Sequence, residues 1–215
     1  MKLLSINVSK KVDCEYKGKT VTTGIFKKPV QGKVFVGKNN LEGDEQADLK
    51  NHGGKDMAIY AFSNDHYPYW EDLLGRKSLK YGAFGENLTV EGLREQNIFV
   101  GDQFRIGSCI LEVSQPRIPC FKLSMALDND AAAKILTNSF NCGVYFRVVK
   151  EGHIKEGVSI CKIAEAPNSI DIRSMFRAFF DKQFPNTKQV LQAASQLQPL
   201  SKEWREKAVR RLSKL

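Results

Sequence analysis

The chain predicts a mainly β fold, a meander or barrel of short strands with a few peripheral helices, followed by a small group of three helices. Up to residue 164, short stretches rich in β-branched and aromatic residues alternate with Gly, Pro, Asn and Asp turn signals. Beyond Pro167, the apolar residues recur at helical spacing instead. We therefore expect a β domain over residues 1–166 and a three-helix extension over residues 167–215.

The individual elements follow from local patterns. Residues 64–74 resemble a short amphipathic helix capped by Ser63 or Asn64, and the alanine-rich residues 128–138 suggest a second helix. Ser201 is a plausible cap for the last helix of the tail. Strands are predicted over residues 3–8, 20–26, 33–36, 57–62, 88–90, 103–106, 109–114, 143–149 and 158–164.

Length and composition place the chain among ordinary folded proteins. It has 215 residues, of which 27% are charged and 42% hydrophobic. A chain of this length and composition can bury a hydrophobic core without disulfide or metal crosslinks. Its five cysteines are an odd number and contain no Cys-x-x-Cys pair, which argues against a disulfide framework or a zinc knuckle. Residues 1–8 are too short and polar for a signal peptide, and no apolar run is long enough for a membrane span. We expect a cytoplasmic, reducing location.

The positive charge is concentrated at the C-terminal end. The chain carries a net charge of +9, and residues 201–215 hold six basic and two acidic side chains. Such a charge is compatible with an anionic partner but does not indicate which one. Because the basic residues of the tail are mixed with glutamates and share a helix with an apolar stripe, a solvated helical face is a better interpretation than a nucleic-acid interface.

Cys120 has the most distinctive surroundings of any residue in the chain. Pro116 and Pro119 precede it closely, so we expect its segment to be a rigid, irregular loop at the end of a strand. Arg117 and Lys122 lie close in sequence and could favour the thiolate, the form that attacks electrophiles and binds metals. The alternative is a small buried hydrophobe, the commonest state of a free cysteine.

A second group of candidate residues surrounds His52. Asp44, Asp48 and His52 are spaced by four and would share one face if their segment were helical, so they could form a metal site or merely a solvated face. Cys120 and His52 could also form a nucleophile–base pair, oriented by Asp44 or Glu86. Spacing alone leaves these alternatives open.

Two glycine-containing loops could bind an anion. In Gly53-Gly54-Lys55, paired glycines let the backbone approach a ligand closely, and the lysine adds positive charge. The loop Gly85-Glu86-Asn87 has a similar character. Tight turns without a ligand explain both loops equally well. The nucleotide-binding signatures of P-loop and Rossmann proteins are missing from the sequence.

Six short motifs carry a resemblance to a known family. They are Leu41–Asp48, His52–Asp56, His66–Trp70, Phe84–Leu88, Gly101–Asp102 and Gln115–Leu123. Together and in this order they resemble the MOSC domain family, named for the C-terminal domain of molybdenum cofactor sulfurase. The resemblance runs from about residue 20 to residue 165 and is closest to the bacterial YiiM-like branch, which carries a C-terminal extension similar to the three predicted helices.

The resemblance implies a β-barrel-like domain that binds the molybdenum cofactor, molybdopterin. It implies that Cys120 is either the protein ligand of molybdenum or a carrier of sulfur, and soft thiolate donors do suit this metal. The other residues expected to contact the cofactor, through its phosphate or nearby, are His52, Gly53, Gly54, Lys55, Gly85, Glu86, Asn87, Arg117, Lys122 and Arg147.

The activity implied by the resemblance is the reduction of small N-hydroxylated compounds, such as N-hydroxylated purine bases, to amines. Since the sequence shows no flavin or iron–sulfur signature, we expect a separate electron-donor reductase, a flavoprotein or an iron–sulfur protein. The alternative is a sulfur carrier in which a Cys120 persulfide serves metal–sulfur cofactor assembly. No membrane partner is expected, and a homodimer is compatible with the sequence.

Overall fold

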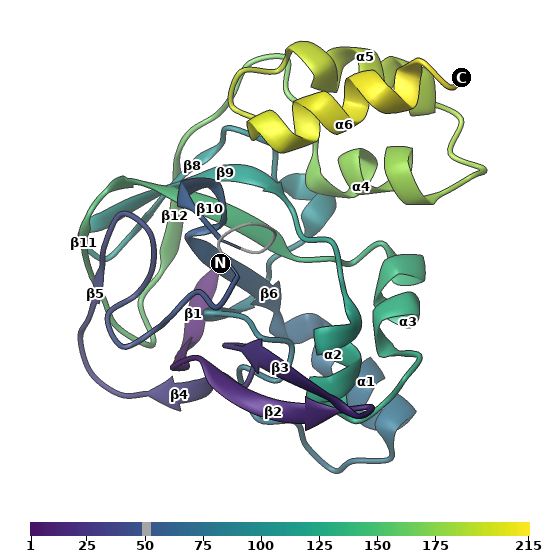
Figure 1. The fold of residues 1–215 in the computed structure, drawn as a ribbon. Coiled ribbons are helices and arrows are strands. Elements are labelled where there is room, and N and C mark those ends of the chain that lie inside the picture. The colour runs from purple at the N-terminus through teal and green to yellow at the C-terminus, as the bar shows by residue number, and fades with distance from the viewer. Residues whose placement is uncertain (49–52) are drawn as a thin grey trace.

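A mixed sheet of eight strands forms the centre of the molecule (Figure 1). The computed structural model describes residues 1–48 and 53–215. Strands β6 and β7 are parallel, and the other neighbouring pairs of this sheet are antiparallel. In spatial order the strands are β12 (Ile160–Ala164), β8 (Gln103–Ile106), β9 (Cys109–Pro116), β10 (Val144–Lys150), β6 (Ile59–Ser63), β7 (Leu88–Glu91), β1 (Lys2–Val8) and β4 (Lys28–Val30).

The two sides of this sheet meet, so that it closes into a barrel. The backbone N–H of Leu3 on β1 donates to the carbonyl of Val158, and the N–H of Gly157 donates to the carbonyl of Leu3, at 3.0 and 2.7 Å. The N–H of Ile160 on β12 donates to Met1 at 2.9 Å. Closure removes the unpaired edge that an open sheet would expose here. The expected barrel-like β domain is confirmed.

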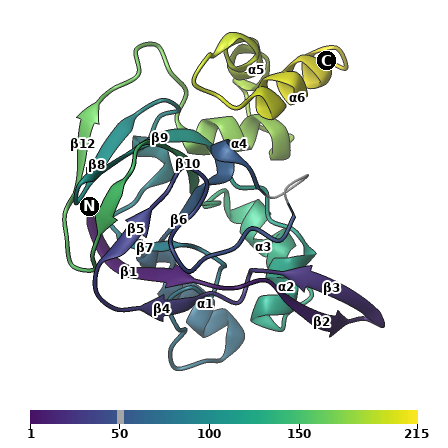
Figure 2. The same cartoon turned by 60° about the vertical axis from the view of Figure 1, so that its left-hand side comes forward.

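Two small sheets extend the barrel. Strand β2 (Val12–Tyr16) pairs with β3 (Lys19–Thr23), and β5 (Val34–Val36) pairs with β11 (Gly152–Ile154). Lys17 and Gly18, which connect β2 to β3, both have positive φ, as a two-residue hairpin turn requires. Figure 2 shows this hairpin extending away from the barrel.

Three helices cover one side of the barrel around a cluster of aromatic rings. They are α1 (Tyr67–Leu74), α2 (Phe121–Leu127) and α3 (Ala132–Ser139). Trp70 of α1 meets Phe84 edge to face with ring centroids 5.3 Å apart, and both side chains are fully buried. Short 3₁₀ turns η1 (Lys55–Met57), η2 (Asn64–His66) and η3 (Glu95–Asn97) complete the connections.

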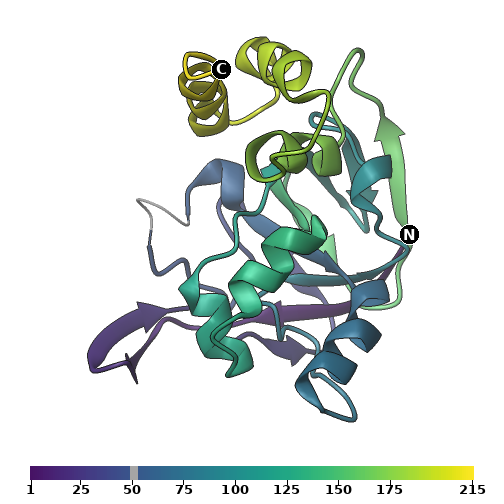
Figure 3. The ribbon, with the colours of Figure 1, turned by 90° about the vertical axis from the view of Figure 1, so that its right-hand side faces the viewer.

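The three predicted C-terminal helices are present and lie together at one end of the barrel (Figures 1 and 3). They are α4 (Ile172–Phe180), α5 (Thr187–Gln196) and α6 (Lys202–Leu212). Ser201 caps α6 as expected, because its Oγ accepts the N–H of Trp204. Met175, Phe176 and Trp204 belong to the same buried cluster as the barrel strands, so the helices share the barrel's hydrophobic core.

Some local expectations need correction. Residues 41–48 are not helical, so the condition under which Asp44, Asp48 and His52 would share one helical face is not met over the described part of this segment; Asp44 instead accepts the backbone N–H of Ser9 next to β1. Helix α2 begins at Phe121, directly after Cys120, so only part of the cysteine segment is irregular. No strand was expected between residues 26 and 33, yet Pro29 lies within β4, where a proline is tolerated because β4 is at the sheet edge. Across the described ranges, no helix is long and apolar enough to cross a bilayer.

Candidate active site

One pocket of the described structure brings together segments that are distant in the sequence. Cys120 and Lys122 lie on one part of its wall, and Gly85 and Asn87 on another. Tyr145 of β10 joins them. The remaining described wall comes from residues within 23–27, 44–48, 57–60 and 117–118. The structure thus gathers five of the predicted cofactor-contacting residues, Gly85, Asn87, Arg117, Cys120 and Lys122, around one cavity.

Cys120 presents a partly exposed thiol to this pocket. It is the N-cap residue of α2, with an extended backbone at φ −133° and ψ 176°. The carbonyl of Cys120 accepts the N–H of Leu123 at 2.9 Å, which ties it to the first turn of α2. Cys109 and Cys142 are buried, and burial raises the pKa of Cys109 to about 11 and that of Cys142 well above its usual value. Of the five cysteines, Cys120 alone lines this pocket.

Arg117 supplies a buried positive charge next to Cys120. It is 6% exposed, its guanidinium lies 4.7 Å from the centre of the Tyr60 ring, and Nη1 donates to the Tyr60 hydroxyl at 3.4 Å. Burial lowers the pKa of Arg117, but Tyr60, Tyr145 and Cys120 raise it, with a net increase above the ordinary value. The guanidinium therefore remains charged, and a fixed cation near a thiol favours the thiolate form.

The two tyrosines around Arg117 stay neutral. Burial raises the pKa of both Tyr60 and Tyr145, and Arg117 opposes that rise in each case. Their rings are 5.2 Å apart, and the Tyr60 hydroxyl donates to the carbonyl of Cys142 at 3.0 Å. Arg117 is thus held in place by the face of the Tyr60 ring and by hydrogen bonds with Tyr60 and Tyr145.

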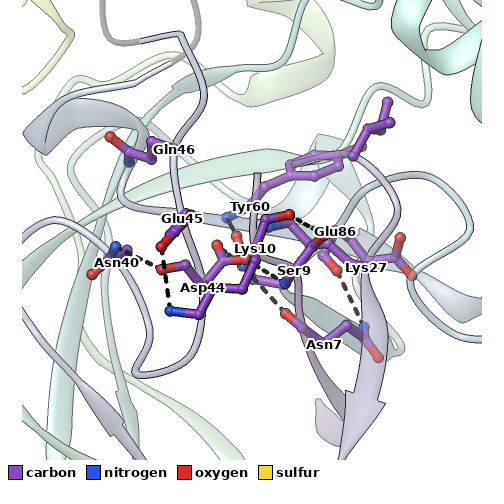
Figure 4. A network of polar contacts seen from close by, with 12 residues as sticks. Asn7, Ser9, Lys10, Lys27, Asn40, Asp44, Glu45, Gln46, Tyr60 and Glu86 are labelled. Carbon is purple, nitrogen blue, oxygen red and sulfur yellow. Dashed lines mark hydrogen bonds and ion pairs between the residues drawn. The ribbon is translucent and has the colours of Figure 1, made fainter. Parts of the chain in front are cut away.

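A buried ion pair forms another part of the pocket wall (Figure 4). Nζ of Lys27 lies 2.5 Å from Oδ1 of Asp44, and the two side chains are only 9% and 4% exposed. Oδ1 of Asp44 also accepts the N–H of Ser9 at 2.8 Å, and Oδ2 accepts Nδ2 of Asn87 at 2.9 Å. Lys27 was not expected at the site. Its neighbour Lys28 has the same side chain, so the sequence offers no signal that separates them.

Glu86 does not line the pocket in the described structure. It is fully buried and accepts hydrogen bonds from the hydroxyls of Tyr67 and Thr89 and from the backbone N–H groups of Gly82 and Phe84. Burial raises the pKa of Glu86, partly offset by these hydrogen bonds. The carboxyl group therefore organises its own loop and is not part of the described pocket wall.

The glycines of this loop allow close packing against residues 25–27. A Cβ on Gly85, which has φ +75°, would lie 2.7 Å from Cγ1 of Ile25. A Cβ on Gly82 would lie 2.7 Å from the carbonyl oxygen of Lys27. These contacts favour the tight-turn interpretation of the loop, which fixes the segment that carries Lys27.

The other predicted contacts lie elsewhere or outside the described residues. Arg147 forms ion pairs with Asp56 and Glu112 at 2.9 and 2.7 Å. Among the described residues, Gly53, Gly54 and Lys55 are not part of the pocket wall, and the N–H of Gly54 donates to Oε1 of Gln46. His52 lies outside the described residues, so its proposed roles with Asp48 or Cys120 stay predictions. Within residues 1–48 and 53–215, no cluster of three His, Cys, Asp or Glu side chains is arranged to hold a metal.

The molecule is a closed barrel with a pocket cysteine beside a buried arginine. The MOSC domain profile matches residues 48–160, and the chain belongs to the MOSC domain family. Uncharacterized protein YflK of Bacillus subtilis is 37% identical over 216 residues, covering 99% of this chain and 95% of YflK. Protein YiiM of Escherichia coli is 38% identical over 134 residues, covering 61% of this chain and 60% of YiiM.

Solved structures agree with this assignment. The crystal structure of YiiM from Geobacillus stearothermophilus has a TM-score of 0.81 and 32% identity, with 98% of each chain covered. The crystal structure of YiiM from Escherichia coli shows the same fold, with a TM-score of 0.77, 24% identity and coverage of 100% of this chain and 94% of that one. The chain is therefore a YiiM-like MOSC protein, with the C-terminal helices included in the structural match.

Proposed function

We propose that this protein is a molybdenum-cofactor enzyme that reduces N-hydroxylated compounds, such as N-hydroxylated purine bases, to amines. The observation that carries the proposal is the position of Cys120 in a pocket beside the permanent charge of Arg117. A fungal relative supports a redox role. A protein named Reductase from Gibberella moniliformis is 36% identical over 146 residues, which cover 66% of this chain and 26% of that protein.

The residues around the pocket fit such a cofactor chemically. Thiolate is a donor that molybdenum accepts, so Cys120 would hold the metal. Lys122 lines the same pocket and would attract the pterin phosphate, whereas Arg117 is engaged by tyrosines and would keep the thiolate charged. Arg147 already faces two carboxylates, which makes it a weaker candidate for the phosphate. When bound, the cofactor would supply two-electron redox chemistry at its metal.

The overall reaction fixes what the protein must provide. Reduction of R–NH–OH by two electrons and two protons breaks the N–O bond and gives R–NH₂ and water. The electrons would come from a separate reductase, a flavoprotein or an iron–sulfur protein. The pocket would bind the substrate, limit its contact with water and supply a proton to the leaving oxygen.

Metal analysis of protein produced in a cofactor-competent host tests the proposal. Molybdenum should be present in the wild type and lost in Cys120→Ser. Cys161→Ser is the matched control, because Cys161 is exposed and lies on β12 outside the pocket. It should retain the metal. A wild type without molybdenum, or equal molybdenum in Cys120→Ser, would contradict the assignment.

The second candidate function is sulfur transfer, and the same thiol favours it. A partly exposed cysteine near a fixed cation is also suited to carry a persulfide. Mass spectrometry after exposure to a sulfur donor distinguishes the two. A gain of about 32 Da on Cys120, without bound molybdenum, would favour the carrier. Bound molybdenum with no such adduct would favour the reductase.

A further inference from the structure

Lys27 is a buried lysine in the wall of the pocket that holds Cys120. Lysine side chains are almost never fully buried unless they are paired. Here the Lys27 side chain is 9% exposed and pairs with Asp44 at 2.5 Å, while Lys28, the next residue, is exposed on β4. Of these two adjacent lysines, only Lys27 is therefore removed from water, and its side chain lies in the wall of the pocket.

The position of Lys27 is built by several parts of the chain. Asp44 is itself fixed by Ser9 and Asn87, so its carboxylate cannot turn away from the lysine. The backbone N–H of Lys27 donates to the carbonyl of Ile25 at 2.8 Å. The loop that contains Gly82 packs against the carbonyl of Lys27 with no room for a side chain. These contacts hold the ammonium group at one place in the pocket wall.

The electrostatic surroundings make the proton of Lys27 easier to remove. Burial lowers the pKa of Lys27, and this outweighs the opposing effects of Asp44 and Glu86. Glu45, another carboxylate of the wall, pairs with Lys10. The other titratable groups of the described pocket wall are Asp48, Tyr60, Arg117, Cys120, Lys122 and Tyr145.

We propose that Lys27 is the proton donor for N–O bond cleavage, an inference that rests on the proposed function. Two electrons from the separate reductase enter the N–O bond as it breaks. The Lys27 ammonium gives one proton to the departing hydroxyl oxygen, which leaves as water, and solvent supplies the second proton to the substrate. Neutral Lys27 then takes a proton from solvent, and Asp44 keeps the side chain in place throughout.

Three substitutions in the molybdenum-loaded protein test this role. Lys27→Met removes both the charge and the proton, whereas Lys27→Arg keeps a charge for Asp44 but releases no proton in the working pH range. With an N-hydroxylated purine base as substrate and a reduced viologen dye as electron donor, kcat should fall by about 100-fold or more in both variants. Molybdenum content and substrate Kd should stay close to wild type. The matched control, Lys28→Met, should keep the wild-type kcat.

A measurement independent of turnover is the titration of the lysine ammonium groups by ¹⁵N NMR in the wild type. The Lys27 signal, assigned by its loss in Lys27→Arg, should titrate at lower pH than that of Lys28. In the wild type, kcat should fall as pH rises through the Lys27 titration, which tests the role without comparing turnover among the variants. Coincident titration of Lys27 and Lys28, or a flat profile, would overturn the proposal.

The outcomes separate this inference from the proposed function. If the wild type holds molybdenum and reduces the substrate while Lys27→Met or Lys27→Arg turns over equally fast, the reductase assignment stands and the proton donor is wrong. If Lys27→Arg alone restores turnover, the side chain acts through its charge, which also overturns proton donation. If the wild type contains no molybdenum, both proposals fall together.

Discussion

Asp44 and Glu86 are two buried carboxyl groups that both act on Lys27, but their hydrogen-bond and ion-pair partners differ. Asp44 faces a cation, because Nζ of Lys27 lies 2.5 Å from Oδ1. Glu86 receives hydrogen bonds only from neutral hydroxyl and backbone groups among its described partners. Asp44 lines the pocket, whereas Glu86 is not among the described residues of its wall.

The difference shows how a motif can serve function indirectly. The Phe84–Leu88 motif looked like a ligand-binding loop, yet its acidic residue is used to fix the loop's own backbone. The rigid loop in turn packs against residues 25–27 and donates from Asn87 to Asp44. Glu86 therefore supports the pocket from outside, whereas Asp44 and Lys27 form its surface.

Among the tests of this comparison, removal of the Glu86 carboxyl group should have the largest effect on the free energy of unfolding. Glu86→Ala leaves two buried N–H groups and two hydroxyls without their acceptor, so unfolding free energy should fall by about 3–5 kcal/mol. Urea unfolding measures it. Glu91→Ala is the control, because Glu91 is exposed at the end of β7, and its effect should stay within about 0.5 kcal/mol. A loss for Glu86→Ala no greater than for Glu91→Ala would contradict the structural role.

A somewhat smaller effect is expected for Gly85→Ala. The new Cβ would meet Ile25 at 2.7 Å in a backbone with φ +75°, and we expect a loss of roughly 2–4 kcal/mol from the clash and the strained backbone together. Gly92 has the same φ of +75° but no neighbour within 4 Å of such a Cβ. Gly92→Ala should therefore cost only the backbone strain, about 1–2 kcal/mol. Equal thermal shifts for the two variants would rule out the packing contact.

The pH dependence of stability provides a third test. Because burial raises the folded-state pKa of Glu86, the folded protein binds more protons than the unfolded chain between the ordinary value of 4.5 and the raised value. The contribution of Glu86 is thus fully present below about 4.5 and is lost as pH rises through the raised pKa. Glu86→Gln has no such titration, so the wild-type stability minus that of Glu86→Gln should decline with pH in urea unfolding. If the stability of the wild type relative to Glu86→Gln rises with pH instead, the predicted direction of the pKa shift of Glu86 is wrong.

The smallest effect is expected at the rim of the pocket. Lys10 and Glu45 form an ion pair at 3.3 Å, but their side chains are 67% and 36% exposed. Water screens such pairs, so Lys10→Ala should change stability by at most about 0.5 kcal/mol, with the change shrinking in high salt. If Lys10→Ala lowers the free energy of unfolding as much as Glu86→Ala in the same urea series, solvent exposure does not explain the different contributions of Glu45 and Glu86.

Much of the barrel could be predicted because its strands carry local signals. The strand over residues 103–106 has the predicted bounds, and the predicted helix over residues 64–74 became η2 and α1. Strand β4 was missed because Pro29 reads as a breaker, and only tertiary position shows that β4 is an edge strand. Helix α2 was missed because the prolines before Cys120 hid its start.

The site was predictable only in part. Cys120 and Arg117 are close in sequence, so their proximity could be expected. Lys27 meets Asp44 only after β1 and β4 pair and place residues 9, 27 and 44 side by side. Charge and spacing in one sequence do not reveal such a meeting, nor do they show that Arg147 is taken up by Asp56 and Glu112.

The closure of the barrel also sets the order in which the molecule can be completed during translation. Strand β1 begins at Lys2, yet one of its flanks is bonded to residues near Ser159. The nascent chain must therefore keep its first strand available until more than 150 residues have been made. Contacts so distant in sequence form slowly, because the chain loses the entropy of closing a long loop before these contacts contribute favourable free energy. Release of the last barrel strand from the ribosome is thus the earliest moment at which the seam can form.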